Sequence, residues 1–322
     1  MTVIIPKKVY LTIVAAAVRF ANARIDRDDW LEVSGIFIGR NEGKGSNANV
    51  IITEAFPIMH QELDKDAVID QYKWADEDYI ALATIEDEAF CRDPPEFTVG
   101  WWHTHPGFKV MMSHIDIRTT LSYQTNNPLA ISLVFNPLRL VKQTEVPDKK
   151  GDPEIKLKND PGFKIYRLDD VNKGVQASYH DVDFEIQGFE SMEELITQMQ
   201  KFIIDLTTSF PKDNLVESYD KLVKDKVNEL NALVLGTDEY LKTLIRKGEA
   251  SRVPEVLENQ KKDIRKFIAE TFIKIGNVKE FLDYVEYKER ETIIPAVQQI
   301  IHEWDEAVSK IDSTLTELTK KY

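Results

Sequence analysis

The amino-acid sequence predicts an α/β domain followed by an all-α region. Up to about residue 190, short runs rich in β-branched and aromatic residues alternate with stretches of helical period, as is typical of α/β folds. From Ser191 onward, apolar residues recur at helical spacings to the end of the sequence. We therefore expect a catalytic domain over residues 1–190 and a helical region over 191–322, and 322 residues are enough for both.

The sequence opens with a short strand near Val3–Ile5 and a helix over Val9–Ala23. Basic residues before this apolar stretch and small residues after it imitate a secretory signal. Leu11, Val14 and Val18 nevertheless fall on one helical face, which is typical of a helix packed against a sheet. We therefore expect this stretch to be part of the fold rather than a signal peptide.

The rest of the first domain consists of apolar runs separated by turn-forming residues, with two polar insertions. The insertions, His60–Ala67 and Lys142–Gly162, lack an apolar period and are expected to be exposed. In the helix expected over Gln71–Cys91, the candidate buried positions are Trp74, Ile80, Leu82, Ile85 and Phe90. The expected strands cover Val33–Arg40, Asn49–Pro57, Thr98–Thr104, Leu129–Phe135, Phe163–Leu168 and Ala177–Ile186, and the expected helices cover Gln71–Cys91 and Asp116–Thr125.

The C-terminal region is predicted to form helices over Met192–Ser209, Asn214–Leu235 and Asp238–Arg246. Two later stretches repeat apolar residues at alternating spacings of four and three, and such heptad seams must be buried against another helix. An intramolecular hairpin or bundle fits the seams, and so does a coiled coil with a partner or a second copy. Gly276 and Pro295 are expected to mark kinks or ends. The seam positions are Ile264, Ile268, Thr271, Ile275, Val278, Leu282 and Val285, then Val297, Ile301, Trp304, Val308, Ile311, Leu315 and Leu318.

Charge and cysteine content limit the possible classes of function. The formal net charge is −14 and no basic stripe is present, so a nucleic-acid surface is not expected. The single cysteine, Cys91, excludes an internal disulfide and suits the reducing cytoplasm, where we expect the protein. No Cys/His signature surrounds Cys91, which argues against a nucleophilic role. No apolar run reaches the roughly 18 residues of a spanning helix, so no membrane association is expected.

The stretch Gly100–Thr120, GWWHTHPGFKVMMSHIDIRTT, contains three of the six histidines. His103 and His105 lie two residues apart, so in an extended strand both imidazoles point to the same face. After a short loop that ends near Ser113, Asp116 can bring its carboxylate to the same ion. Two neutral imidazoles and one carboxylate leave a fourth position of tetrahedral zinc for water, as in catalytic zinc sites. These residues therefore predict a catalytic metal site.

Each part of this pattern also has a plainer interpretation. A His-x-His pair alone is common on surfaces and in packing. Ser113-x-x-Asp116 before an apolar periodic stretch is typical of a helix capping box, with Asp in place of Glu. The cap and the metal site are compatible, because a cap would fix the direction of Asp116. The joint spacing, His-x-His-Pro, six residues, Ser, two residues, Asp, is what favours the metal site.

This joint pattern resembles that of the JAMM, or MPN-plus, family of zinc metallo-isopeptidases, whose motif adds a distant upstream Glu. Glu32 in LEVSGIFIG matches that position. GWWHTHPGF and ISLVFNP (Ile131–Pro137) are similar to the branch that contains the proteasome-lid deubiquitinase and the signalosome isopeptidase. The resemblance covers about residues 1–190. It implies an MPN (JAMM, cytidine-deaminase-like) domain with a central curved mixed sheet flanked by helices.

The resemblance also implies an activity, a zinc-dependent deubiquitinase or ubiquitin-like deconjugase that hydrolyses a Gly–Lys isopeptide bond. One catalytic zinc ion would be held by His103, His105 and Asp116. Glu32 would act as general base, and Ser113 would donate to the oxyanion. The implied partners are ubiquitin or ubiquitin-like conjugates, and MPN-type or lid-like subunits at the C-terminal helices. The alternatives are a catalytically quiet scaffold subunit of a lid-like or signalosome-like complex, and a hydrolase acting on a sulfur-carrier-type protein.

Other residues interleaved with the motif are expected to have supporting roles or none. Trp101, Trp102 and Phe108 are expected to support the zinc ligands through packing rather than to touch substrate. Thr104 and His114 point away from the site by strand alternation or helix position, so no chemistry is assigned to them.

Overall fold

The computed structural model describes residues 1–322 except 44–47, 62–73, 142–158, 210–214, 282–284 and 286. Most of the two predicted insertions, His60–Ala67 and Lys142–Gly162, lies outside the described residues. The chain forms two compact units, of which the first comprises Met1–Asp213 and Tyr284–Glu289 and the second Asn214–Asp283 and Arg290–Tyr322. The functional division into a catalytic domain over 1–190 and an assembly region over 191–322 stays a prediction.

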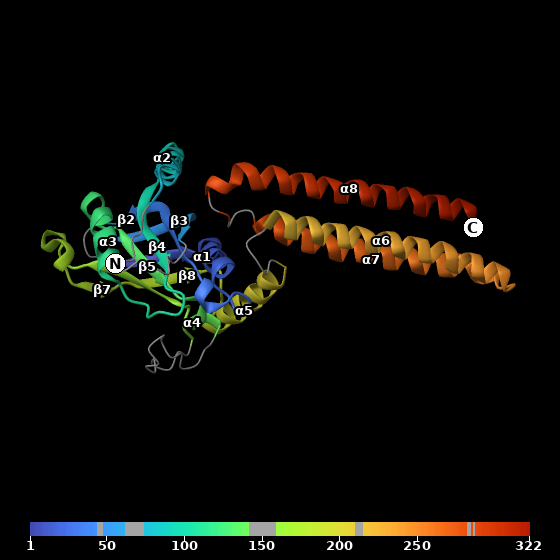
Figure 1. The fold of residues 1–322 in the computed structure, drawn as a ribbon, viewed down its shortest axis with the longest axis horizontal. Coiled ribbons are helices and arrows are strands. Elements are labelled where there is room, and N and C mark those ends of the chain that lie inside the picture. The colour runs from blue at the N-terminus through green and yellow to red at the C-terminus, as the bar shows by residue number, and fades with distance from the viewer. Residues whose placement is uncertain (44–47, 62–73, 142–158, 210–214, 282–284, 286) are drawn as a thin grey trace. The chain divides into compact units, whose positions relative to one another are not determined.

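The first unit is built on one mixed sheet of eight strands, in the order β7-β6-β5-β4-β2-β3-β1-β8 (Figure 1). β4 lies near the middle, antiparallel to β2 on one side and parallel to β5 on the other. The predicted α/β class with an all-helical C-terminal region is confirmed. The strands are β1 (Thr2–Pro6), β2 (Glu32–Glu42), β3 (Asn49–Gln61), β4 (Phe97–Thr104), β5 (Ile131–Phe135), β6 (Phe163–Leu168), β7 (Tyr179–Asp181) and β8 (Asp183–Gln187).

The last predicted strand, Ala177–Ile186, is wrong in one respect, because the structure divides it at Val182 into β7 and β8. β7 pairs with β6 and β8 pairs with β1, so these consecutive strands lie at opposite ends of the strand order. The Val182 N–H donates to the Ile165 carbonyl at 2.8 Å. A single residue therefore connects the two edges, and the sheet curves into a nearly closed barrel. Side-chain alternation indicates which face a residue takes, not which strand it pairs with.

The apolar N-terminal stretch forms α1 (Lys7–Phe20), as expected for a helix packed on the sheet. Its Tyr10 ring contacts Phe163 of β6 at a centroid distance of 5.8 Å. The helix is buried on nearly all sides, since α5 (Met192–Ser209) contacts it as well. This double packing explains why the stretch is more apolar than a surface helix needs to be.

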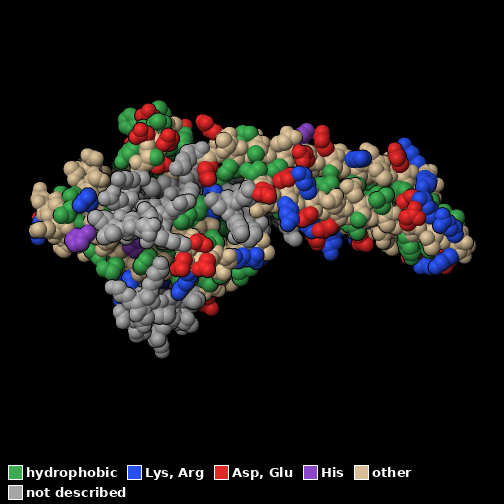
Figure 2. Space-filling model, in the orientation of Figure 1, with side chains coloured by type: hydrophobic (Ala, Val, Ile, Leu, Met, Phe, Trp, Pro, Cys, Tyr) green, Lys and Arg blue, Asp and Glu red, His purple; other side chains and the backbone are tan. Residues whose placement is uncertain are grey.

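Two helices pack on the opposite face of the sheet, α2 (Asp76–Phe90) and α3 (His114–Asn126). α2 turns Ile85 and Ala89 toward the core. The expectation that Ile80 and Phe90 are buried is wrong, because they are 66% and 69% exposed. Each lies five residues from Ile85, which places it on another side of the helix. Figure 2 shows the resulting mixture of hydrophobic and acidic side chains over α2.

A short segment far along the chain completes the first unit. This segment, η6 (Tyr287–Glu289), contacts α2 and β3. The Glu289 carboxylate accepts two hydrogen bonds from the Arg19 guanidinium, at 2.8 and 3.0 Å, and Arg19 is only 8% exposed. The Tyr287 ring meets the Phe56 ring edge-on at 6.2 Å. The charge of a buried arginine in α1 is therefore neutralised by a residue 270 positions later.

The second unit consists of three long helices that lie side by side, α6 (Leu215–Arg246), α7 (Val253–Phe281) and α8 (Arg290–Lys321) (Figure 1). The prediction of separate helices over Asn214–Leu235 and Asp238–Arg246 is wrong, because α6 continues through Gly236. A glycine inside a helix costs about 1 kcal/mol. Burial of the flanking Val234 and Thr237 offsets that cost. α7 and α8 likewise continue past Gly276 and Pro295.

Most described residues of the heptad seams are buried within this second unit. Ile264 and Ile275 of α7 and Trp304 and Ile311 of α8 are at most 4% exposed. α6 makes contacts with both α7 and α8, whereas α7 and α8 contact each other less. Most described seam residues are therefore buried against helices of the same chain.

Candidate metal centre

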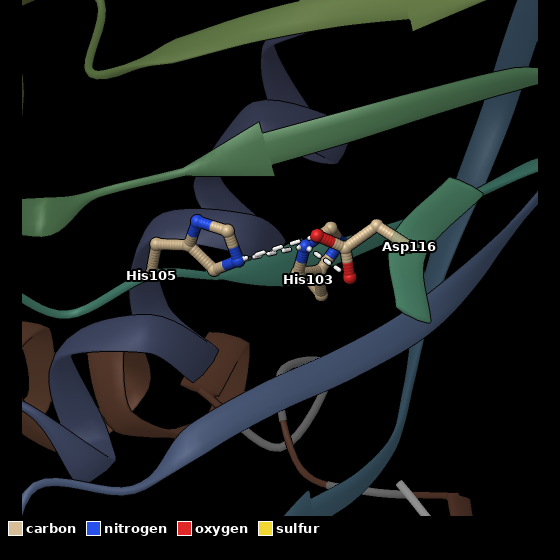
Figure 3. A group of neighbouring side chains, drawn as sticks. All are labelled: His103, His105 and Asp116. Atoms are coloured by element: carbon tan, nitrogen blue, oxygen red, sulfur yellow. Dashed lines mark hydrogen bonds and ion pairs between the residues drawn. The ribbon is translucent and has the colours of Figure 1, made fainter. Parts of the chain in front are cut away.

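The three predicted ligand side chains converge where β4 ends and α3 begins (Figure 3). His103 belongs to β4, His105 directly follows the strand, and Asp116 lies in the first turn of α3. The Nε2 atoms of the two histidines are 3.1 Å apart, and Asp116 Oδ1 lies 3.2 Å from His103 Nε2. Asp116 Oδ2 lies 3.6 Å from His105 Nε2. One ligand atom from each of the three residues can be chosen so that all lie within 4.8 Å of one another.

The loop after β4 holds His105 in one tautomer. His105 Nδ1–H donates to the Lys109 carbonyl at 2.9 Å, because a carbonyl can only accept. In a neutral imidazole, the Nε2 lone pair is then directed toward His103 and Asp116. Gly107 has a φ of 79°, which lets the chain turn back so that Lys109 reaches the ring. Hydrogen bonds of this kind orient metal-binding histidines in general.

Two polar side chains hold the same loop, one directly after β5 and one in β6. Asn136 Nδ2 donates to the Phe108 carbonyl at 2.7 Å, and the Tyr166 hydroxyl donates to the Val110 carbonyl at 2.6 Å. Burial raises the pKa of Tyr166 above its usual value, so this hydroxyl remains a donor at neutral pH. Sequence reasoning assigned neither residue a role. The one available signal was a polar Asn136 at the end of the buried run ISLVF.

His103 is completely buried and stacks on Trp101, with ring centroids 4.4 Å apart and an interplanar angle of 8°. Trp101 Nε1–H donates to Thr120 Oγ1 on α3 at 3.1 Å, which connects the strand to the helix that carries Asp116. The packing role expected of Trp101 is thus present in the structure. Phe108 is 40% exposed, with its ring 6.5 Å from that of His105.

Ser113 and Asp116 form the capping box at the start of α3. Ser113 Oγ accepts from the Asp116 N–H at 3.2 Å, and the Ser113 N–H donates to Asp116 Oδ2 at 2.6 Å. Burial alone would raise the pKa of Asp116, but the charges of His103 and His105 and these hydrogen bonds lower that pKa well below its usual range. Asp116 is therefore ionised at neutral pH. The cap occupies the oxygen of Ser113 as an acceptor and leaves its hydroxyl proton to donate elsewhere.

Glu32 is the first residue of β2 and is half-buried. Two residues later, Ser34 pairs with His103 across the β2–β4 ladder. Because side chains alternate along a strand, Glu32 and Ser34 share the face of the sheet on which His103 lies. The glycine that follows in the LEVSG motif is required by space, since a Cβ on Gly35 would lie 2.1 Å from the Phe56 carbonyl oxygen.

The donor set fits a metal ion better than it fits hydrogen bonds alone. His105 Nε2 and the ionised Asp116 are acceptors, and both face His103 Nε2. One proton on His103 Nε2 would serve only one of them, and the buried His103 Nδ1 has no hydrogen-bond partner among the described residues. A cation contacted by all three groups satisfies them together. Two imidazoles and one carboxylate are also the protein ligands of known catalytic zinc sites.

A family model described as JAB1/Mov34/MPN/PAD-1 ubiquitin protease matches residues 1–129 of the chain. That stretch contains Glu32, the three converging side chains and Ser113. The match shows that residues 1–129, which include β4 and its neighbour β2 in the curved mixed sheet, resemble the JAB/MPN family.

Relatives in several organisms resemble this chain. It is 26% identical to 26S proteasome non-ATPase regulatory subunit 14 of Caenorhabditis elegans over 219 residues, 66% of this chain and 67% of that protein. It is 34% identical to 26S proteasome regulatory subunit rpn11 of Schizosaccharomyces pombe over 90 residues, 27% of this chain and 29% of that protein. It is 28% identical to ubiquitin carboxyl-terminal hydrolase RPN11 of Saccharomyces cerevisiae over 118 residues, 37% and 35% of the two chains. The chain thus spans about a third of each yeast relative.

None of the helices in the described part of the chain combines the length and apolar character that crossing a membrane requires.

Proposed function

We propose that this protein is a zinc-dependent isopeptidase, a deubiquitinase or ubiquitin-like deconjugase that hydrolyses the bond between a C-terminal glycine and a lysine. The observation that carries the proposal is the convergence of His103, His105 and Asp116 in a domain whose family is described as a ubiquitin protease. The name of the Saccharomyces cerevisiae relative, a ubiquitin carboxyl-terminal hydrolase, supports the same class of reaction.

In this proposal His103, His105 and Asp116 hold one zinc ion. When bound, zinc supplies a Lewis acid and lowers the pKa of a water molecule toward neutrality. The chain prepares two of these three ligands for this role. Asp116 is kept ionised by its surroundings, and His105 is kept in the required tautomer by the Lys109 carbonyl.

Glu32 and Ser113 act on the proton and on the developing negative charge. Glu32 takes a proton from the attacking water and later passes it to the leaving lysine amine. The Ser113 hydroxyl donates to the oxyanion that forms on the scissile carbonyl. The Asp116 N–H donates to Ser113 Oγ and so holds that hydroxyl in place. No covalent intermediate is required. The exposed Cys91 takes no part, so a thiol-directed reagent is expected to leave the activity unchanged.

We also propose that the helical unit binds a partner protein. The groove between α7 and α8 has apolar walls, and Phe272 at its edge is 61% exposed. Arg265 lines the α7 side, whereas Asp305 and Asp312 line the α8 side. An amphipathic helix with basic residues toward α8 matches this surface. The names of the relatives, which are proteasome regulatory subunits, support an MPN-type or lid-like subunit as the partner. The apolar residues are Ile268, Ala269, Phe272, Trp304 and Val308.

The decisive experiment is cleavage of a ubiquitin chain or a ubiquitin-like C-terminal fusion by the full chain. The reaction is run with zinc present, chelated and restored, beside the variant Glu32→Gln. Activity that disappears with the chelator, returns with zinc and is absent from Glu32→Gln supports the proposal. An inactive chain that binds no zinc would overturn it and leave the scaffold alternative. An inactive chain that binds one zinc ion would be tested again with a lid-like partner added.

A further inference from the structure

We propose that Thr104 is a positioning residue for Glu32, an inference that rests on the proposed role of Glu32 as general base. Thr104 lies between the two histidine ligands, on the opposite face of β4, and is only 1% exposed. Its hydroxyl does not face the metal ligands. It instead contacts the strand that carries Glu32.

The contact lies where the ladder between β2 and β4 ends. The paired residues of this ladder run from Gly39 and Phe97 to Ser34 and His103. One residue beyond the last pair, the Val33 N–H donates to Thr104 Oγ1 at 2.9 Å. A side chain of the ligand-bearing strand thus makes the last hydrogen bond between β2 and β4 before Glu32, whereas the pairing of β2 with β3 continues to Glu32 and Gln61.

Both ends of this hydrogen bond are held in place. Thr104 pairs with Phe135 of β5, and the next N–H along the chain, that of His105, donates to the Phe135 carbonyl at 2.8 Å. Val33 is completely buried. The hydroxyl therefore connects the neighbour of the proposed base to the residue between two proposed ligands.

The consequence for catalysis follows from the short reach of proton transfer. A general base must lie within hydrogen-bond distance of the proton that it removes. A misplacement of about 1 Å can cost about a hundredfold in rate. If β2 separates slightly from β4 at its end, Glu32 moves while His103, His105 and Asp116 remain together. Loss of the Thr104 hydroxyl should therefore reduce turnover without reducing zinc binding.

The test uses three variants of the full chain. Thr104→Val keeps the shape of the side chain and removes the hydroxyl, whereas Thr104→Ser keeps the hydroxyl. Thr12→Val is the matched control, because Thr12 is 2% exposed and donates to the Lys8 carbonyl at 3.0 Å within α1. For each variant we would measure kcat and KM on a ubiquitin-like fusion, zinc affinity by competition with a chromophoric chelator, and hydrogen exchange at the Val33 amide.

We expect Thr104→Val to lower kcat about 10- to 100-fold with unchanged KM and zinc affinity, and to remove exchange protection at Val33. Thr104→Ser and Thr12→Val should keep the kcat of the unmodified protein. An unchanged kcat in Thr104→Val, a parallel loss of zinc, or a failure of Thr104→Ser to restore turnover would overturn the inference. An unmodified protein that holds zinc but cleaves nothing, even with a lid-like partner, counts against the proposed function. Protection of Val33 that survives in Thr104→Val counts against the contact itself.

Discussion

At the scale of the residue, two side chains of the proposed site, Ser113 and Asp116, also form the N-terminal cap of α3. Asp116 Oδ2 accepts from the Ser113 N–H in the helix cap, while Oδ1 faces His103. Ser113 caps α3 by accepting from the Asp116 N–H with its hydroxyl oxygen, and in the proposed mechanism its hydroxyl proton donates to the oxyanion. Substitutions at these positions therefore need controls that separate the loss of a cap from the loss of a ligand or donor.

Asp116→Asn is expected to abolish stoichiometric zinc binding while α3 stays folded. The amide oxygen still accepts from the Ser113 N–H, but the negative charge that faces the histidines is lost. Mass spectrometry measures the zinc content, and circular dichroism measures the helicity that shows whether α3 stays folded. The matched control is Asp78→Asn, since Asp78 is 3% exposed and accepts from the Ala75 N–H at 2.9 Å in the cap of α2. Full zinc content in Asp116→Asn would contradict the ligand assignment.

Ser113→Ala is expected to lower kcat by about 10²- to 10³-fold, the usual cost of removing one oxyanion donor. It should also lower the free energy of unfolding by about 1 kcal/mol, because a helix cap is lost. Zinc content should not change. Ser191→Ala is the control, because Ser191 Oγ accepts from the Glu194 N–H at 3.1 Å at the start of α5. If both variants lose stability and neither loses activity, Ser113 is a cap and no more.

The converging residues of the site were predictable because their spacing is local. His103, His105, Ser113 and Asp116 lie within fourteen consecutive residues, and strand alternation plus a capping box is enough to orient them. Their supports were not predictable. Asn136, Tyr166 and Thr104 act on loop or strand atoms that lie 28, 56 and 71 positions away in the sequence. Contacts at such separations follow from strand order, which leaves no periodic pattern in the sequence.

At the scale of the element, the end of α8 is fastened to α6 by one carboxylate. Asp238 accepts from Lys321 Nζ at 2.9 Å and from the Tyr322 hydroxyl at 2.8 Å, and it forms an ion pair with Lys242 at 2.7 Å. Hydrogen bonds from Lys242, then from Lys321, lower the pKa of Asp238 well below its usual range. A carboxylate with a lowered pKa stabilises the fold above its unfolded-state pKa, which is about 3.9 for Asp.

The stabilisation by Asp238 is therefore expected to be complete at neutral pH and to be lost as the pH falls below about 4 toward the lowered value. Asp238→Asn should cause the same loss of stabilisation at neutral pH, which is measured as faster hydrogen exchange in the last turn of α8. Glu239→Gln is the control, since Glu239 pairs with the same Lys242 but is 66% exposed in its side chain. Equal exchange rates in the unmodified chain and Asp238→Asn would show that the contacts of Asp238 contribute no measurable stability to the end of α8.

Sequence patterns predicted the type of most elements but not how they pair or where they continue. The period of apolar residues identified α1, β4 and α5 because each has a regular buried face. The apolar period gave the wrong prediction at Val182, where one alternating run forms two strands at opposite edges of the sheet. It was also wrong at Gly236, where packing keeps the helix continuous. In both cases tertiary contacts decide, and propensity is the weaker influence.

At the scale of the whole molecule, the first unit depends on residues that follow α6 and α7 in the sequence. The buried Arg19 pairs with Glu289, whose side chain is 24% exposed. Removing one partner of a buried ion pair typically costs about 3–5 kcal/mol, because the other charge stays buried and uncompensated. Glu289→Gln is therefore expected to lower the free energy of unfolding of the first unit by up to about 3 kcal/mol.

Urea unfolding, followed by fluorescence of the tryptophans, measures this loss. The exposed Glu291 at the start of α8 supplies the control Glu291→Gln. Replacing both partners, as Arg19→Met with Glu289→Leu, should recover most of the stability, because no charge is then left unpaired. A Glu289→Gln variant as stable as its control would mean that water, rather than Glu289, compensates Arg19.

The return of the chain at Tyr287–Glu289 also sets an order of events during synthesis. All eight strands have left the ribosome once Gln187 is out, yet the residues that cover Phe56 and neutralise Arg19 are made about a hundred positions later. At about 5–20 residues per second, that interval lasts roughly 5–20 s. During it Arg19 lacks its ion pair with Glu289, and Phe56 lacks its ring contact with Tyr287. The first unit to be translated is thus among the last parts of the molecule to be finished.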